Sequence, residues 1–158
     1  MRKISISSDH AGFGLKESIK KFLIKKKFLL LDLGPRDDKS VDYPDYAKKL
    51  AKNIISKKSD TGILVCGSGT GMAMSANRFK KIRAAVCYNE KSTKLSRSHN
   101  NANIIAIGSR LINKNLAFKL VMIFLNLFAD MAIPVPEPQI SIPVPLFLEI
   151  IFFANFFA

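Results

Sequence analysis

The sequence is poor in the residues that build disulfide frameworks and metal sites. It contains two cysteines, Cys66 and Cys87, two histidines, His10 and His99, and no tryptophan. Two cysteines, each inside an apolar and strand-like run, do not make the disulfide scaffold of a small secreted protein or a structural zinc site. The paired His, Asp and Glu spacing that is typical of metal ligands is also missing. We therefore expect no metal and no cofactor.

Signals for export or membrane insertion are also missing. The first ten residues, MRKISISSDH, lack the apolar core of a signal peptide, so a reducing cytoplasm is the expected compartment. A membrane-spanning helix needs about 20 apolar residues, whereas the run Leu146–Ala158 is shorter and contains Glu149. We expect no membrane partner. An altered terminus is the plainer interpretation of this run, and a membrane-peripheral or partner-binding tail is the alternative.

Acidic residues are few, and the formal net charge is +13. No lysine or arginine follows Lys119. A basic excess raises the question of nucleic-acid binding. Here the excess is mostly lysine, scattered along the chain, which is more typical of solvated helix faces than of an arginine-led reading surface. We therefore expect no nucleic-acid partner.

Strand-like and helix-like segments alternate with a short period up to about residue 130. Apolar runs predict strands over residues 3–8, 28–33, 62–66, 83–88 and 104–108. Amphipathic patterns predict helices over residues 12–27, 44–55, 71–79, 92–99 and 116–129. Such alternation is typical of an α/β protein, with a Rossmann-like three-layer α/β/α fold and a five-stranded parallel sheet. We expect one domain over residues 1–130 and an atypical Pro- and Phe-rich tail over 131–158 that is not a separate domain.

Ligands of parallel sheets bind beyond the carboxyl ends of the strands. That rule selects three loops that can lie along one edge of the sheet, namely residues 8–10, 67–71 and 109–110. His10, Arg110 and the backbone amides of the glycine-rich loop all favour an anion. The residues alone therefore predict a phosphorylated small molecule as ligand, with thiol or imidazole acid–base chemistry.

The segment Cys66–Gly71 (CGSGTG) is the strongest local feature of the sequence. It follows an apolar strand and precedes a helix, so several amides near a helix start can face an anion. It fits neither the dinucleotide fingerprint, because Met72 stands where glycine is needed, nor the phosphate loop that ends in lysine. Cys66 beside a helix N-terminus is a candidate thiolate base or nucleophile. A structural cysteine at a strand end is the alternative, and it is the expectation for Cys87.

Both histidines lie where strands and helices meet. His10 follows Asp9, and His99 precedes Asn100. A lone histidine is often a structural hydrogen-bonding residue, but polar neighbours on a shared edge favour a functional role. We expect His10 and His99 to lie on the same edge as Cys66.

Together these residues strongly resemble the ribose-5-phosphate isomerase B family and its galactose- and allose-phosphate isomerase relatives. The resemblance covers residues 1–128 and includes several separate motifs in the family's order, which makes it far more specific than any one motif. The matching stretches are SDHAGF at 8–13, VDYPDYA at 41–47, residues 62–72 with Ala76-Asn77, IRAA at 82–85, SHNNAN at 98–103 and GSR at 108–110.

The resemblance implies interconversion of ribose 5-phosphate and ribulose 5-phosphate, a step of the pentose phosphate pathway, without a metal. It makes Cys66 the base that moves a proton between the first two sugar carbons. Ser68 stands where the family usually has threonine, and its hydroxyl is placed to move a proton between the sugar oxygens. The enediolate would be held, as in an oxyanion hole, by the amides of Gly67, Ser68, Gly69, Thr70 and Gly71.

Further roles follow from the same resemblance. His99 resembles the acid that opens the furanose ring, and Asp9 assists it. Implied substrate ligands are His10 and Arg110 for phosphate, Asn100 for the sugar or enediolate, and Tyr43 for the ring pocket. Family members are dimers or pairs of dimers whose sites draw on both subunits, so we expect a homo-oligomer and a sugar-phosphate substrate.

The C-terminus departs from the family pattern. The family continues with a glycine pair and two arginines that clamp the phosphate, whereas Ile133 and Glu137 stand near those places and no arginine follows Arg110. A frameshifted or replaced terminus is one hypothesis for this change. Two alternatives stay open: a hexose-6-phosphate isomerase, and a catalytically impaired homologue that binds a sugar phosphate or a partner.

Overall fold

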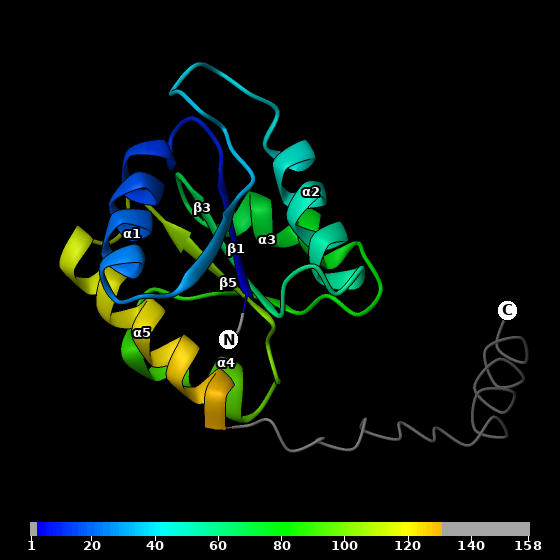
Figure 1. Ribbon diagram of the computed structural model, residues 1–158, viewed down its shortest axis with the longest axis vertical. Helices are drawn as coiled ribbons and strands as arrows, with labels where there is room; N and C mark the ends of the chain where they lie inside the picture. The colour runs from blue at the N-terminus through cyan, green and yellow to red at the C-terminus, as the bar shows by residue number, and fades with distance from the viewer. Residues whose placement is uncertain (1–2, 131–158) are drawn as a thin grey trace, which may run out of the picture.

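The computed structural model describes residues 3–130, which fold into a five-stranded parallel sheet in the order β2-β1-β3-β5-β4 (Figure 1). The strands are β1 (Lys3–Ser8), β2 (Leu29–Asp32), β3 (Thr61–Cys66), β4 (Ala84–Val86) and β5 (Ile104–Gly108). The helices are α1 (Phe13–Lys25), α2 (Tyr43–Ile55), α3 (Thr70–Asn77), α4 (Glu90–Ser98) and α5 (Lys114–Asp130). The predicted α/β fold is confirmed.

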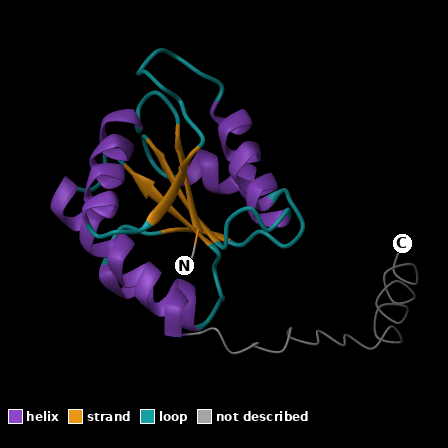
Figure 2. Cartoon of the chain, viewed as in Figure 1, coloured by secondary structure: helices purple, strands orange, loops and turns teal. Residues whose placement is uncertain are grey.

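Two apolar cores lie on the two faces of the sheet (Figure 2). Helices α1 and α5 cover one face, where Ile6, Ile19 and Phe124 are buried together, and α4 packs against α5. Helices α2 and α3 cover the other face, where Leu50 and Met72 are buried. Every residue of β3 and β5 is buried, which explains the continuous apolar runs of these central strands.

The structure differs from the predicted element bounds mainly at the sheet edges and at α4. Strands β2 and β4 are shorter than predicted, because each is an outer strand paired on one side only. Helix α4 begins at Glu90 because Asn89 forms a capping box with Ser92: its side chain accepts a 2.7 Å hydrogen bond from the Ser92 N–H.

The predicted tail over residues 131–158 lies outside the described residues. Among the helices of residues 3–130, none is both long enough and apolar enough to cross a membrane.

Candidate active site

Three loops meet at the carboxyl edge of the sheet. Strands β1, β3 and β5 are neighbours, so the loops that follow them lie side by side. Between them is a cavity of about 380 Å³. Its lining contains eight of the predicted site residues: Asp9, His10, Tyr43, Cys66, Gly67, Ser68, Gly71 and Arg110. Ala11 and Leu111, which also line the cavity, were not predicted, although each directly follows a residue that was.

Cys66 is the last residue of β3, and its thiol is held by the glycine-rich loop. The Gly69 N–H donates a hydrogen bond to the Cys66 Sγ at 3.0 Å. Gly69 has a φ of 82°, a left-handed conformation that glycine adopts without strain, and α3 begins at the next residue. The sulfur therefore accepts a backbone hydrogen bond from the residue that directly precedes α3.

Cys87 has a different environment, as the sequence predicted. It is buried in the core beneath α5, and its Sγ is 3.8 Å from the Ser96 hydroxyl. Burial raises the pKa of the Cys87 thiol, because the thiolate would be desolvated. Cys87 is therefore a core thiol rather than a base.

Asp9 is fixed at the start of α1. Its side chain is almost fully buried, and one carboxylate oxygen accepts a 2.7 Å hydrogen bond from the Gly12 N–H. The loop passes so close to β3 that a Cβ on Gly12 would lie 2.2 Å from the Val65 carbonyl oxygen. Only glycine fits at position 12, and its absence of a side chain lets Asp9 and His10 reach the edge of the cavity.

Arg110 and Tyr43 pack on the glycine-rich loop from two sides. The guanidinium of Arg110 would be 3.4 Å from a Cβ on Gly67. The backbone N–H of Arg110 also donates a hydrogen bond to the Gly67 carbonyl at 3.0 Å. The Tyr43 ring would be 3.1 Å from a Cβ on Gly71. The cavity therefore has a cation at one wall, an aromatic ring at another and backbone amides at its floor, which suits a small anion with a hydroxylated body.

His99 and Asn100 lie elsewhere, so the prediction that His99 shares an edge with Cys66 is wrong within one chain. His99 ends α4, and β5 begins at Ile104, which puts both side chains at the amino edge of the sheet. With a rise of about 3.3 Å per residue, the six residues of β3 separate the two edges by roughly 17 Å. The helix of a βαβ unit runs antiparallel to its strands, so a residue that ends a helix lies where the next strand starts. That rule was a signal in the sequence that could have located His99.

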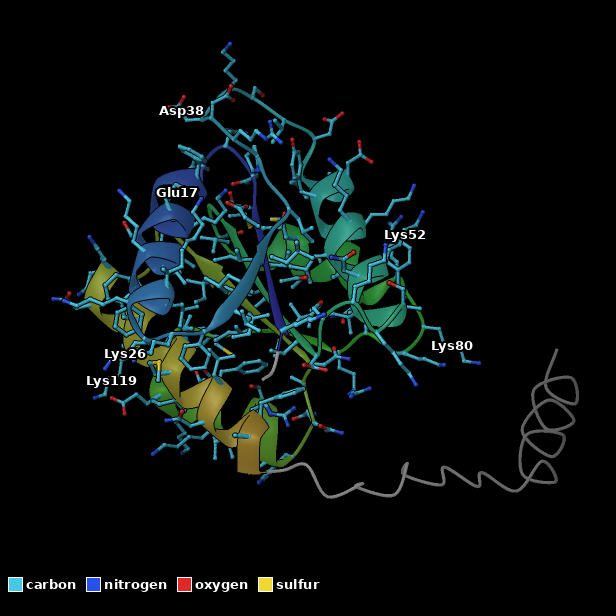
Figure 3. All side chains as sticks on the ribbon, viewed as in Figure 1. Glu17, Lys26, Asp38, Lys52, Lys80 and Lys119 are labelled. Carbon is cyan, nitrogen blue, oxygen red and sulfur yellow. The ribbon has the colours of Figure 1, made fainter. Side chains whose placement is uncertain are left out.

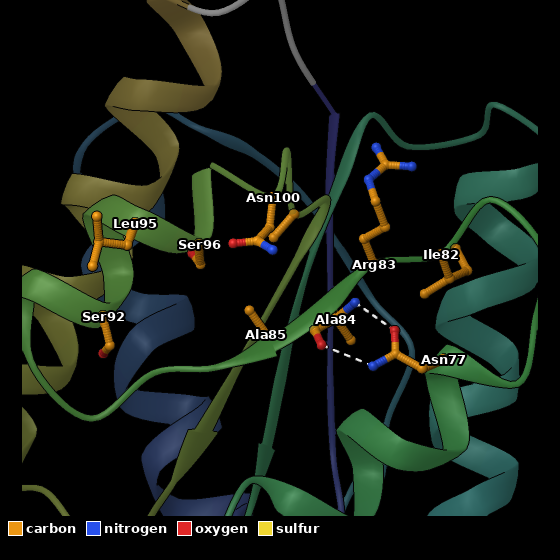
Figure 4. A pocket seen from close by; sticks show the side chains of 10 residues that line it. Asn77, Ile82, Arg83, Ala84, Ala85, Ser92, Leu95, Ser96 and Asn100 are labelled. Carbon is orange, nitrogen blue, oxygen red and sulfur yellow. Dashed lines mark hydrogen bonds between the residues drawn. The ribbon is translucent and has the colours of Figure 1, made fainter. Parts of the chain in front are cut away.

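Asn100 lines a second cavity of about 520 Å³ beside the outer strand β4 (Figure 4). Leu95 and Ser96 of α4 form one wall and Asn77 the other, where its amide makes two hydrogen bonds to the backbone of Ala84. Leu95 is 38% exposed and lies one helical turn before His99, so the two side chains share one face of α4.

No local sequence pattern predicted the buried charge of Lys16 behind the loop that follows β2. Lys16 is fully buried, and its Nζ donates to the Pro35 carbonyl at 2.7 Å and to Asp32 at 3.0 Å. The Gly34 carbonyl in turn accepts from the Ser8 N–H, directly before Asp9. Lys16 looks like any other helix lysine in the sequence, and only packing against β2 reveals its role.

No group of three or more His, Cys, Asp or Glu side chains within residues 3–130 is arranged to hold a metal ion. The cavity at the carboxyl edge is instead lined by a thiol, an imidazole, a carboxylate and a guanidinium, together with residues of the glycine-rich loop. Such a set can transfer protons and stabilise an oxyanion.

Comparisons with known proteins agree with this chemistry. A sequence profile of the Ribose/Galactose Isomerase family matches residues 4–132. Ribose-5-phosphate isomerase B of Escherichia coli (strain K12) is 40% identical over 121 residues, which cover 77% of this chain and 81% of that protein. A putative sugar phosphate isomerase of Bacillus subtilis (strain 168) is 41% identical over 125 residues, with coverage of 78% and 84%.

Solved structures give the same result. The chain is similar to a ribose 5-phosphate isomerase from Thermotoga maritima, with a TM-score of 0.77, 51% identity and coverage of 78% of this chain and 86% of that one. It is also similar to ribose-5-phosphate isomerase B from Mycoplasma genitalium with bound ribulose-5-phosphate, with a TM-score of 0.73, 41% identity and coverage of 78% and 82%. The chain therefore belongs to the ribose/galactose isomerase family, and by that membership it is an aldose–ketose isomerase.

Proposed function

We propose that the chain interconverts ribose 5-phosphate and ribulose 5-phosphate through an enediolate, with Cys66 as the base. The observation that carries this proposal is the Cys66 thiol at the cavity, hydrogen-bonded by the Gly69 amide at the start of α3. A thiol that accepts a backbone hydrogen bond and lines a polar cavity is placed for proton abstraction next to a carbonyl group.

The reaction needs one carbon-bound proton and one hydroxyl proton to move. The Cys66 thiolate removes the proton from C2 of the open-chain aldose, and the electron pair moves onto the carbonyl oxygen at C1, which gives the enediolate. The hydroxyl proton on the oxygen at C2 then moves to the oxygen at C1. The thiol then returns its proton to C1 while the oxygen at C2 becomes the new carbonyl. Ser68, whose side chain faces the same cavity, moves the proton between the two oxygens. The amides of residues 67–71 hold the negative charge.

The phosphate is held by His10 and Arg110, which line the same cavity. Both side chains are exposed at the cavity, and Arg110 is fixed over Gly67 by its own backbone hydrogen bond. Arginine can donate two parallel hydrogen bonds to a phosphate. Tyr43 closes the pocket around the sugar, and Asp9 assists ring opening.

We further propose that His99 and Asn100 act in the site of a second copy of the chain. Both are exposed at the amino edge, whereas Cys66 of the same chain lies at the carboxyl edge, and the length of β3 separates the two edges by roughly 17 Å. Leu95 lies one helical turn before His99 on α4, and Met74 of α3 and Tyr88 after β4 are 68% and 57% exposed. Apolar side chains beside an outer strand favour a protein partner. A homodimer, or a pair of dimers, would bring His99 of one copy to Cys66 of the other.

A coupled turnover assay on the purified chain tests the activity. Ribose 5-phosphate should be converted, and ribulose 5-phosphate should react in reverse. Faster turnover of galactose 6-phosphate or allose 6-phosphate would favour the hexose-phosphate alternative. Binding of ribose 5-phosphate without turnover would overturn the proposal in favour of an impaired homologue, the reading that Ile133 and Glu137 in the tail suggest.

A further inference from the structure

The short segment His99–Asn100 is exposed, yet the residues on both sides of it are firmly anchored. After it, Asn103 accepts a hydrogen bond from the Arg83 N–H at 2.8 Å, donates to the Lys81 carbonyl at 2.8 Å, and its own carbonyl bonds the Thr61 hydroxyl at 2.9 Å. These contacts tie the end of the turn to the starts of β3 and β4. Rigid anchoring is unusual for an exposed loop tip, which is normally the mobile part of a fold.

The anchor on the other side is Arg97, which is only 1% exposed. Its Nη1 donates to the Asn101 side-chain oxygen at 3.0 Å and to the Ala102 carbonyl. Its backbone carbonyl accepts the Asn101 N–H at 3.0 Å. Asn101 has a φ of 45°, in the left-handed region, so the turn reverses sharply at the residue that Arg97 holds twice.

The guanidinium is also fixed from the side of α5. Its Cζ lies 4.4 Å from the centre of the Phe128 ring and 5.7 Å from that of Phe124. Aromatic faces attract the cation and fix its plane. The end of α5 is thereby connected, through one buried side chain, to the turn that carries His99 and Asn100.

Burying an arginine costs desolvation, and an apolar side chain of similar size would fill the same space beside two phenylalanines. What the guanidinium adds is a fixed position for Asn101 and Ala102, directly after the exposed pair. We propose that Arg97 is a positioning residue for the reaction, which holds the His99–Asn100 turn rigid so that it fits the site of a second copy. This inference rests on the proposed role of His99 in the partner's site.

Mixing experiments with pairs of inactive variants test the inference and its premise separately. Cys66→Ala and His99→Asn chains, each inactive alone, are unfolded together and refolded as a mixture. Half of the resulting dimers are mixed, and each holds one intact site, so roughly a quarter of the wild-type activity should return. Failure of this control would overturn the shared site of the proposed function.

Cys66→Ala is then mixed with Arg97→Met. The intact Cys66 lies on the Arg97→Met chain, whereas the correctly held His99 lies on the Cys66→Ala chain. If Arg97 acts through the turn, the same quarter of the activity returns. If the control succeeds and this pair does not, Arg97 is needed inside its own chain and the inference fails.

Arg97→Lys provides a second test if Arg97→Met does not fold. Lysine keeps the charge but lacks the planar fork, so kcat for cyclic ribose 5-phosphate should fall at least tenfold while KM changes less than twofold. A four-carbon aldose phosphate, which cannot close a furanose ring, should lose less of its rate, because it needs Asn100 but not ring opening by His99. Equal losses on both substrates would overturn the inference.

Thr93→Val is the matched control. Thr93 is fully buried in α4, and its hydroxyl bonds the Asn89 carbonyl at 2.8 Å at the other end of the helix. Removing this hydroxyl should lower the melting temperature, and it should slow turnover of the cyclic and the acyclic substrate by the same factor. If Thr93→Val, like Arg97→Lys, slows the cyclic substrate more than the acyclic one, any weakening of α4 produces this difference. That result would overturn the role of Arg97.

Discussion

At the scale of single residues, the two cysteines differ through their hydrogen-bond partners rather than through their exposure. Both are buried, but the Gly69 N–H points at the sulfur of Cys66, whereas Cys87 lies in the apolar core with a hydroxyl neighbour. Burial raises the pKa of Cys87, so its thiol stays protonated near neutral pH.

Cys66→Ala should therefore lower kcat at least 10²-fold, the lower end for a positioned acid–base group, with little change in melting temperature. Cys87→Ala is the matched control and should leave kcat nearly unchanged, although it leaves a small cavity. Steady-state turnover and thermal denaturation of both variants provide the check. Similar activity losses that follow lost stability would mean that both cysteines are structural.

The proposed function divides the reaction between His99, which opens the sugar ring, and Cys66, which transfers the proton. His99→Asn should slow turnover of cyclic ribose 5-phosphate more than turnover of a four-carbon aldose phosphate, which is already open. Initial rates on the two substrates measure the difference. An equal loss on both would remove the ring-opening role from His99.

At the scale of elements, the close approach of the β1–α1 loop to β3 depends on Gly12. A Cβ there would meet the backbone of Val65, which cannot move without displacing a central strand. Gly12→Ala should lower the free energy of unfolding by about 1–3 kcal/mol, the usual cost of overpacking, and shift Asp9 with it. Urea denaturation and kcat together measure the two effects.

Gly14→Ala is the control, because nothing lies within 4 Å of a Cβ at that position of α1. Alanine in a helix is more stable than glycine by roughly 0.5–1 kcal/mol, so this variant should be at least as stable as the wild type. A destabilised Gly14→Ala with an unaffected Gly12→Ala would contradict the close approach.

The ion cluster between α1 and β2 predicts a dependence of stability on pH. Burial alone would raise the pKa of Asp32, but hydrogen bonds from Lys20, the Gly34 N–H and Lys16 outweigh it and lower that pKa. A carboxyl with a lowered folded-state pKa stabilises the protein fully above its unfolded-state pKa, near 3.8, and loses this contribution as the pH falls through the folded-state value.

Asp32→Asn should therefore be less stable than the wild type at pH 6, and the difference should shrink below about pH 4. Urea denaturation over this pH range measures it. Asp38→Asn, in the exposed loop before α2, is the control, and its free energy of unfolding should equal that of the wild type at every pH. A constant difference between Asp32→Asn and the wild type at every pH would contradict the role of the carboxylate charge.

At the scale of the whole molecule, the chain departs from its family after α5. The family profile matches up to residue 132, and the residues that stand near the family's two phosphate-binding arginines are Ile133 and Glu137. Under the proposed function, His10 and Arg110 are then the main cationic ligands for phosphate, so Arg110→Ala should raise KM steeply.

Replacing the residues after Phe128 with a family-like terminus that carries both arginines should lower KM for ribose 5-phosphate at least tenfold, equivalent to about 1.4 kcal/mol. The kcat should change less, because Cys66 and the amide loop are untouched. Steady-state kinetics on the exchanged chain measure both values. Unchanged KM in a folded and dimeric exchanged chain would mean that the present tail, or a lysine, already binds the phosphate.

Many of the predicted site residues follow from local sequence patterns. The alternation of apolar runs predicted each strand and helix found within residues 3–130, because burial on one or both faces of an element imposes its own period on the sequence. The loops after β1, β3 and β5 were predicted from chain direction alone, since parallel strands end at one edge. The family motifs added Tyr43, which belongs to α2 and which no strand-end rule selects.

What the tertiary structure alone decided concerns residues whose partners are distant in the chain. Lys16 and Arg97 look like ordinary helix cations in the sequence, yet packing buries Lys16 beneath Pro35 and Arg97 against Phe128. The same holds for the surface lysines. Lys26 follows α1 and Lys80 follows α3 in the sequence, and the fold places the two lysines on opposite sides of the molecule, with Asp38 at its upper end in the same view (Figure 3).

The physical reason is that some features depend on residues nearby in the sequence, whereas others depend on residues that only the fold brings together. Element type depends on neighbours within a few residues, so the sequence determines the strands, the helices and the amide loop that holds Cys66. The edge on which a side chain lies, and the cost of burying its charge, depend on how whole elements pack. His99 therefore belongs to the far edge of its own chain, where Arg97 fixes the turn that carries it.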